Sequence, residues 1–497
     1  MSLKNNALGL GLLALTCACS GGDAPTRPNV LFITLDTTRA DFLSCYGGEK
    51  TVTPTFDNLA KEGVRFANAN SSSAVTPVSH ATILTGKFQH NHGLRVISGA
   101  GGAYLDRDEW YLPATLKQAG YSTAAVHSAF PVSASFGFER AFDEFHDFDA
   151  EMTEGKREGG TVWDMGDYQR RSDETTDIAI EVADGLAEPF FMWVHYWDPH
   201  DEMRLPAEAY LKQHGVPDHK KLRKADEMYA AEVGYMDREF GRLLDHLRAT
   251  ERYEDTIVVV TSDHGEGLSD GAEYHGWDGH RMLYREQVHV PLIFRFPADV
   301  EVPTKKVVQQ LVRTADIVPT LLEYLNLPAT DRFDGRTLSP LIRAEPDEPR
   351  IAFYDQINGY DLNAHLVERR PDAAFLYTVN DGKWKLTYRP HMPEESELFE
   401  WAGDRRERKN LYDKRPNQVR RLLILLAREQ PWVTAPFSGE SEDSSASDAL
   451  GALGYTESVA SDARWAWTCP SHQTLYFEEP DLCSECNEFP IPIPARD

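Results

Sequence analysis

Ser71–Gly86, with the sequence SSSAVTPVSHATILTG, is the stretch that decides the fold of this chain. Threonine followed by proline is a helix-start signal, because a threonine oxygen can cap free N–H groups and proline suits the first helical position. We therefore expect a helix from Pro77 to about Thr85 that ends at Gly86. The Thr76 hydroxyl would lie at the positive end of this helix, where an anion binds favourably. It could be a nucleophile toward a sulfate or phosphate ester, although an isolated threonine of this kind is usually only a cap.

Continuous apolar runs elsewhere in the chain predict buried strands of a parallel sheet. These runs are Asn29–Leu35 (NVLFITL), Ser122–His127, the apolar part of Pro189–Asp201, and the start of Asp255–Gly267. Apolar residues at helical spacing predict helices over Pro54–Phe66 and Ala230–Leu247. The sequence thus predicts an α/β fold whose central, mostly parallel sheet is flanked by helices. Open sheets of this kind place their ligands at the carboxyl ends of the strands.

The run T-P-V-S-H-A-T-I-L-T-G resembles the signature helix of the sulfatase family, in the alkaline phosphatase superfamily, whose pattern is C/S-x-P-S-R-x-x-x-L-T-G. In this match Thr76 falls on the nucleophile position and His80 on the arginine. Family sulfatases convert the Cys or Ser at the nucleophile position to formylglycine, a conversion that threonine cannot undergo. The departure points to relatives with an unmodified threonine: nucleotide pyrophosphatase/phosphodiesterases, phosphoethanolamine transferases and lipoteichoic acid synthases.

Two more segments resemble the family and supply candidate metal ligands. The family's strand-D-D-x-R-x-D is matched at Asp36, while Thr37 replaces the second aspartate. The family's T-S-D-H-G-E is matched at Asp263 and His264, and a carboxylate beside an imidazole suits a divalent metal. The resemblance implies one site for zinc, manganese or calcium, formed by Asp36, Asp263, His264 and the nucleophile Thr76 itself. Binding of Thr76 to the metal matters because a free threonine hydroxyl is a poor nucleophile at neutral pH, and a divalent cation stabilises its alkoxide.

Several histidines are further candidates for catalysis. His80, four residues after the nucleophile, could orient the hydroxyl or the anion. The family's H-x-x-x-P-H is matched by His195 and by Pro199-His200, and for His200 the match implies a contact with the substrate anion. A later segment resembles the family's H-G-x-x-x-H, so His275 and His280 are candidates for leaving-group protonation or, with Asp198, for a second metal. The alternative for each of these side chains is a structural role.

The first 19 residues resemble a bacterial lipoprotein signal. One basic residue precedes an apolar run from Ala7 to Leu15, which ends in small residues and cysteine and is too short for a stable membrane span. Cys19 is the expected lipidated residue, with Cys17 as the alternative. Residues 20–28 would be a tether. We therefore expect an exported protein, in the periplasm or at the cell surface, that meets a membrane only through a lipid anchor.

The remaining chain divides into a catalytic domain at residues 29–345, a smaller C-terminal sheet subdomain at 346–430, a linker at 431–464 and a module at 465–497. The linker is acidic and serine-rich around SGESEDSSAS. The module carries Cys469, His472, Cys483 and Cys486 in the spacing C-x2-H-x10-C-x2-C, which suits a structural zinc in a zinc-ribbon-like fold. A disulfide is the alternative in an oxidising compartment.

The overall charge of the chain argues against two classes of binding partner. The 497 residues carry a formal charge of -28, from 79 acidic and 51 basic residues, which argues against nucleic acid and against adhesion to anionic lipid. We therefore predict a metal-dependent hydrolase of a sulfate or phosphate ester that works without formylglycine. Thr76, His264 and the lost carboxylate at Thr37 favour phosphoryl chemistry. The alternatives are a phosphodiesterase or phosphoethanolamine-type transferase, and a non-catalytic anion- or metal-binding protein of the same fold.

Overall fold

The computed structural model describes residues 27–95, 104–106, 108–148, 169–200, 226–276, 279–330, 332–357, 375–390, 392–429, 465–468, 475–476 and 491–494. The predicted signal with Cys19 and the four predicted zinc ligands of the C-terminal module lie outside the described residues. Among the described residues, no helix has the length and apolar character that a membrane crossing requires.

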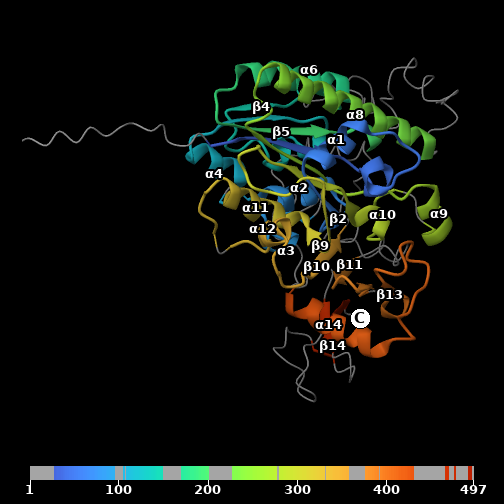
Figure 1. Ribbon diagram of the computed structural model, residues 1–497. Coiled ribbons are helices and arrows are strands. Elements are labelled where there is room, and N and C mark those ends of the chain that lie inside the picture. Colours follow the sequence, from blue (N-terminus) through green and yellow to red (C-terminus); the bar gives the residue numbers. More distant parts are fainter. Residues whose placement is uncertain are drawn as a thin grey trace, which may run out of the picture.

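A nine-stranded sheet forms the centre of the molecule, in the order β4-β3-β5-β1-β6-β8-β2-β7 with β9 beside β2 (Figure 1). Strand β1 (Asn29–Leu35) is fully buried and pairs in parallel with β5 (Phe190–Tyr196) and β6 (Thr256–Ser262). The other strands are β2 (Val64–Asn70), β3 (Ser122–Val126), β4 (Glu144–His146), β7 (His289–Val290), β8 (Leu292–Arg295) and β9 (Lys306–Arg313). Strand β8 runs antiparallel to both β6 and β2. The predicted mostly parallel sheet is confirmed.

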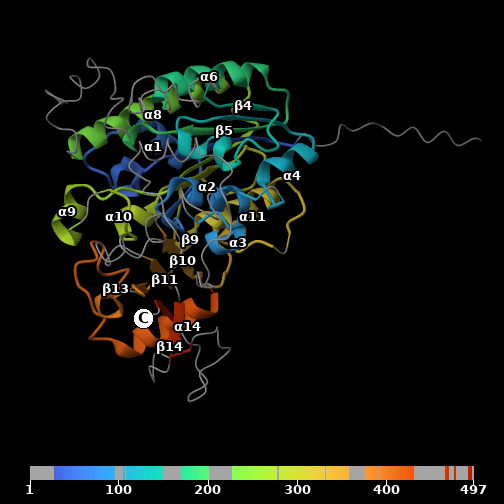
Figure 2. The same cartoon turned by 180° about the vertical axis from the view of Figure 1, so that it is seen from behind.

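Helices cover both faces of this sheet because the side chains of each buried strand alternate between the faces. Val30 and Phe32 of β1 belong to one core, and Leu31 and Ile33 belong to the other. The first core contains α2 (Thr76–Thr85), α4 (Leu112–Gln118), α11 (Ile317–Tyr324) and α12 (Ser339–Arg343). The second contains α1 (Pro54–Glu62), α6 (Ser172–Gly185) and α8 (Asp226–Ala249), and the two layers are seen in Figures 1 and 2.

A separate four-stranded antiparallel sheet follows, which confirms the predicted C-terminal sheet. Its strands are β10 (Ala352–Gln356), β11 (Leu376–Asn380), β12 (Trp384–Tyr388) and β13 (Glu397–Glu400). Helix α14 (Pro416–Glu429) packs against it through Leu422 and Leu426, and together they form the lower part of Figure 1. Beyond it, β14 (Trp465–Thr468) pairs with β15 (Leu475–Tyr476) and β16 (Ile491–Pro494).

Two predicted element boundaries were wrong. Helix α2 begins at Thr76 with Val75 as its N-cap, so the threonine does not cap the helix. The helix predicted over Pro54–Phe66 ends at Glu62, and its last three residues, from Val64 on, belong to β2. The cause is Gly63, where a Cβ atom would lie 2.0 Å from the Phe294 carbonyl oxygen. Only glycine lets the chain turn so close to β8 and enter the sheet.

Helix α1 receives its N-terminal cap from a distant part of the chain. Thr53, at its N-cap position, makes no capping hydrogen bond with its side chain. Instead, the Asp237 carboxylate of α8 accepts hydrogen bonds from the Thr55 and Phe56 amides at 3.1 and 2.9 Å. Burial raises the pKa of Asp237 to about 7. The packing of α8 thus supplies the acceptor that the local sequence lacks.

Candidate active site

Asp36, Asp263 and His264 meet at the carboxyl ends of β1 and β6. Leu35 and Ser262 are paired partners in these parallel strands, so the residues that follow them are neighbours. One ligand atom from each of the three side chains lies within 4.8 Å of the others, and all three side chains are fully buried. In the part of the chain that the structure describes, no other three His, Cys, Asp or Glu residues gather in this way. The structure therefore brings together the predicted ligands; their binding of a cation stays a prediction.

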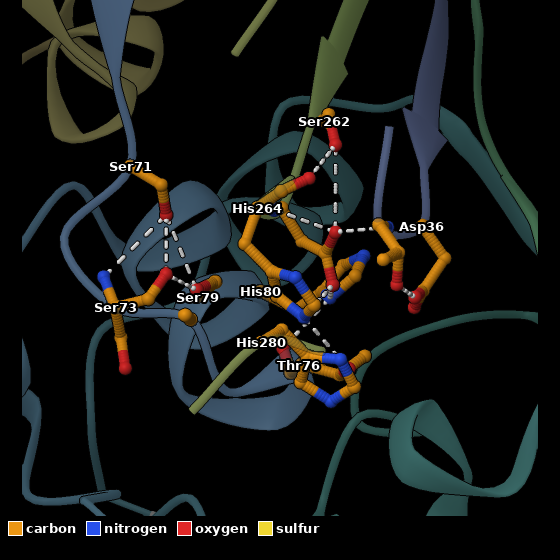
Figure 3. A network of polar contacts seen from close by, with 12 residues as sticks. Asp36, Ser71, Ser73, Thr76, Ser79, His80, Ser262, His264 and His280 are labelled. Atoms are coloured by element: carbon orange, nitrogen blue, oxygen red, sulfur yellow. Dashed lines mark hydrogen bonds and ion pairs between the residues drawn. The ribbon is translucent and has the colours of Figure 1, made fainter. Parts of the chain in front are cut away.

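Thr76 completes this group from the first turn of α2 (Figure 3). Its side chain is buried, and its Oγ1 lies 3.3 Å from His264 Nε2. The other ring nitrogen of His264, Nδ1, donates a hydrogen bond to the Gly265 carbonyl at 3.0 Å. In the neutral imidazole Nε2 is then the unprotonated nitrogen, whose lone pair faces Thr76 and the carboxylates. This is the tautomer that can ligate a metal.

The electrostatics of the group also fit a divalent cation. Asp263 Oδ2 is buried and has no hydrogen-bond partner, although a buried carboxylate oxygen is costly to leave unpaired. Burial raises the pKa of Asp36 to about 7. Burial, followed by the proximity of Asp36, also raises the pKa of Asp263. Two carboxylates, an imidazole and a hydroxyl are a donor set that suits zinc or manganese.

His195, to which the sequence analysis assigned no role, holds one of these carboxylates. Its Nδ1 accepts a hydrogen bond from the Ser128 amide at 3.3 Å, so its Nε2 donates to Asp36 Oδ2 at 3.1 Å. Burial lowers the pKa of His195 to about 3. Strand pairing was the signal that could have found it: His195 lies opposite Thr34, which shares a face of β1 with Asp36. Such orienting partners fix the position of a metal ligand.

Thr37, which stands where the family has a second aspartate, links the two carboxylates. Its amide donates to Asp263 Oδ1 at 3.0 Å, and its hydroxyl donates to Asp36 Oδ1 at 2.5 Å. Its φ of 50° lies in the left-handed region, which is strained for a β-branched residue. Strain of this kind is typical of functional sites. Thr37 therefore replaces a negative charge with two hydrogen-bond donors.

His80 lies beside Thr76 but does not contact its hydroxyl. Its Nδ1 donates to the Thr76 carbonyl at 2.8 Å, and its Nε2 accepts from the Thr34 hydroxyl at 3.0 Å. Burial lowers its pKa to about 3, so it is a neutral imidazole at physiological pH. His80 Nδ1 also lies 3.7 Å from Asp263 Oδ2, and its predicted orienting role toward the hydroxyl or the anion stays a prediction. The two hydrogen bonds of His80 hold the first turn of α2 against β1.

His280 and His200 extend the site away from the predicted metal ligands. The His280 ring centroid lies 4.8 Å from that of His264 and 4.9 Å from that of His200. His280 Nδ1 is 3.4 Å from Glu266 Oε2. His200 stacks on Trp197 at 3.8 Å, and its Nε2 is buried without a hydrogen-bond partner. Burial lowers the pKa of His200 well below its ordinary value. Both predicted catalytic histidines thus lie in one row with His264.

The second predicted metal site, from Asp198, His275 and His280, is not assembled among the described residues. Asp198 instead accepts hydrogen bonds from the amide, at 3.1 Å, and the hydroxyl of Ser172, the first residue of α6. His275 is the last residue of α9 (Ser269–His275). Its Nδ1 lies 2.8 Å from Glu286 Oε1, and its ring stacks on that of Tyr284 with the ring centroids 3.7 Å apart. A helix start and an ion pair therefore use the groups that the prediction assigned to a metal.

Gly265 gives a test of how tightly the ligands are held. A Cβ atom at this position would lie 2.1 Å from the Glu286 carbonyl oxygen, whereas a Cβ at Gly185 in α6 would meet nothing within 4 Å. Gly265→Ala is expected to lower the free energy of unfolding by about 1–3 kcal/mol and to weaken divalent-metal binding. The matched control Gly185→Ala should do neither. Chemical denaturation and metal titration measure both, and wild-type values for Gly265→Ala would contradict the packing described here.

Comparison with known proteins covers residues 28–427 of the chain. The family profile described as Sulfatase matches residues 28–327, and a profile for the C-terminal region of N-sulphoglucosamine sulphohydrolase matches residues 273–427. The chain is similar to an N-acetylglucosamine-6-O-sulfatase of Bacteroides thetaiotaomicron, with 25% identity over 83% of this chain and 88% of that protein.

Solved structures with the same fold include a phosphonate monoester hydrolase of Agrobacterium radiobacter, at a TM-score of 0.62 and 22% identity over 81% of this chain and 96% of that one. Another was solved in complex with its substrate D-glucosamine-2-N,6-O-disulfate, at a TM-score of 0.62 and 22% identity over 81% of this chain and 97% of that one. The Sulfatase profile alone covers more than half of the chain. The chain therefore belongs to the sulfatase family, in the alkaline phosphatase superfamily.

Proposed function

We propose that this sulfatase-family ester hydrolase cleaves a sulfuric or phosphoric ester with Thr76 as its nucleophile. Asp36, Asp263 and His264 would hold one divalent cation, which could be zinc, manganese or calcium. The observation that carries the proposal is the distance of 3.3 Å between Thr76 Oγ1 and His264 Nε2, at the only cluster of potential ligands among the described residues. A hydroxyl so close to the ligands would be close to a cation bound by them.

The chemistry follows from the side chains present. A divalent cation in such a site supplies a Lewis acid that favours the deprotonated hydroxyl and the charge that develops on the ester. Thr76 would pass its hydroxyl proton to solvent, and its Oγ1 would attack the sulfur or phosphorus; the bond from Oγ1 to that atom forms while the bond to the leaving alcohol breaks. His280 would donate the proton that the leaving oxygen takes up, and His200 would contact the substrate anion. Water then attacks the Thr76 ester, which releases sulfate or phosphate and restores the hydroxyl.

The choice between the two esters is open to a direct measurement. Thr76, His264 and the absent carboxylate at Thr37 favour phosphoryl transfer, and a phosphonate monoester hydrolase shares the fold. With zinc or manganese, we expect aryl phosphates or aryl phosphodiesters to be hydrolysed with a kcat/KM at least about tenfold above that of aryl sulfates, a difference of about 1.4 kcal/mol. The similarity to an N-acetylglucosamine-6-O-sulfatase favours the opposite order. A clear preference for aryl sulfate would refute the phosphoryl assignment but leave Thr76 as nucleophile.

Two other activities remain distinguishable by the same assay. If an alcohol rather than water resolves the Thr76 ester, the protein is a transferase, and an added alcohol such as glycerol would divert part of the product into a new ester. If the fold only binds an anion or a metal, manganese would bind but no ester would turn over.

A further inference from the structure

A short helix, α10 (Arg285–Val288), lies between the candidate active site and the C-terminal sheet (Figure 1). The Gln287 carbonyl accepts a hydrogen bond at 2.8 Å from the amide of Gly265, the residue after the last metal ligand. The Val288 carbonyl accepts one at 2.9 Å from the amide of Ser71, which begins the loop before the nucleophile. One turn of helix therefore contacts both halves of the site.

The loop on the nucleophile side is itself rigidly tied. Ser71 Oγ lies 2.9 Å from the Ser73 carbonyl oxygen and 3.2 Å from Ser79 Oγ, and Ser79 Oγ donates to the same carbonyl at 2.8 Å (Figure 3). All three side chains are buried. A displacement of Ser71 would therefore pass to Ser79, which lies one turn after Thr76 on α2.

The start of α10 is held by a buried ion pair of the C-terminal subdomain. Lys385 of β12 and Glu407 are both buried, with Nζ and Oε1 2.9 Å apart. Glu407 Oε2 accepts a hydrogen bond from the Arg285 amide at 2.7 Å, and Lys385 Nζ donates to the Leu283 carbonyl. Each charged group thus binds both its partner and the backbone of the segment that leads into α10.

Further contacts join Glu407 to the same segment. Its carbonyl accepts a hydrogen bond from His275 Nε2 at 3.4 Å. The Arg285 guanidinium lies 3.4 Å above the ring of Trp401, a geometry that suits a cation–π contact. A buried ion pair is weak as a source of stability, because desolvation offsets the attraction, but it can hold a geometry. The pair is therefore better explained by what it positions than by the stability it adds.

We propose that Glu407 is a positioning residue for the active site. Together with Lys385 it fixes the start of α10, and α10 in turn fixes the distance between the nucleophile loop and the turn that carries the metal ligands. Glu407 would act through α10, since its hydrogen bonds and ion pair join it to Arg285, Lys385 and His275. This inference rests on the proposed function, since it assigns the C-terminal subdomain a part in aligning Thr76 with the cation site.

The first test replaces Glu407 by glutamine. Glu407→Gln keeps the shape and an acceptor for the Arg285 amide but removes the charge that faces Lys385. We expect kcat to fall about tenfold or more and manganese affinity to weaken, as for other residues that orient metal ligands. Manganese is the probe because thiolates bind it weakly, so the C-terminal cysteines do not contribute.

Asp237→Asn is the matched control. Asp237 is also a buried carboxylate that accepts backbone N–H groups at a helix start, and its contacts belong to α1 and α8. It should lower the melting temperature while kcat and manganese affinity stay at wild-type values. A second variant, Lys385→Met with Glu407→Leu, replaces the pair by apolar side chains of similar size, which is often neutral or stabilising. This double variant should have a melting temperature close to that of the wild-type protein, but its kcat should stay low.

The outcomes separate cleanly. The inference is overturned if Glu407→Gln matches Asp237→Asn in kcat and manganese affinity, or if the folded double variant regains wild-type kcat. If the wild-type protein binds manganese but turns over no ester, the proposed function fails, and the manganese affinities of the same variants decide the inference alone. A wild-type protein that binds none of manganese, zinc and calcium overturns both.

Discussion

Thr76→Val is expected to lower the turnover of every ester substrate by roughly 10⁴-fold or more, as the loss of other enzymes' nucleophiles does. Valine has nearly the shape of threonine and is branched at the same carbon, so it fits the buried first turn of α2. The three predicted ligands Asp36, Asp263 and His264 are untouched, so the variant should still bind manganese. The change removes one oxygen and leaves the rest of the site in place.

The control for this experiment is Thr76→Ser, which keeps a hydroxyl and should retain most of the activity. Rapid quenching of the wild-type reaction, followed by peptide mass analysis, should find a sulfuryl or phosphoryl group on the peptide that contains Thr76. The valine variant should carry none. Wild-type turnover by Thr76→Val would show that water attacks the ester directly, and the proposed mechanism would be wrong.

Asp263→Asn is expected to abolish both cation binding and turnover. Asp263 Oδ2 is buried and has no hydrogen-bond partner. Asparagine removes the negative charge of this side chain, and an uncharged amide cannot neutralise a cation. Manganese at one hundred times its Kd should raise the free energy of unfolding of the wild-type protein by about 2.7 kcal/mol, and the melting temperature should rise with it. It should have no such effect on the variant.

The order of stability of the wild-type protein and Asp263→Asn is expected to reverse when a chelator removes the cation. The pKa of Asp36 is raised from 3.8 to about 7 by burial, so ionisation of this carboxylate costs folded-state stability as the pH rises between those values. The wild-type protein carries a second buried carboxylate beside it, and the variant does not. With chelator near pH 8, Asp263→Asn should therefore be the more stable protein. A variant that keeps its manganese, or that is less stable than wild type in chelator, would contradict a cation site here.

Strands with continuous apolar runs were the most predictable part of the fold. Asn29–Leu35 was predicted with the bounds of β1, because a strand buried on both faces has no polar interruption. The boundary between α1 and β2 was not predictable, since it depends on the contact of Gly63 with the Phe294 carbonyl from a distant strand. Strand β4 was missed because it has only three residues.

The site was predictable where strand ends carry its residues. Asp36, Asp263 and His264 converge because β1 and β6 are parallel neighbours. His195, within β5, and Asp198, two residues after its end, could not be assigned in the same way. Their roles depend on which groups lie across the interface: the carboxylate of Asp36 for His195, and the amide of Ser172 for Asp198. Motif spacing does not reveal such partners.

The position of β1 in the sheet has a consequence for how the polypeptide reaches its native state. This strand is made first, yet the strands on either side of it, β5 and β6, end only at Tyr196 and Ser262. Helix α1, which follows β1 in the chain, likewise lacks its N-terminal hydrogen-bond acceptor until Asp237 has been synthesised. Ordering these first segments requires closure of very long loops, which slows folding. A nascent chain that ends before Phe190 offers β1 neither of its native neighbours, so this apolar strand stays unpaired until β5 has been synthesised.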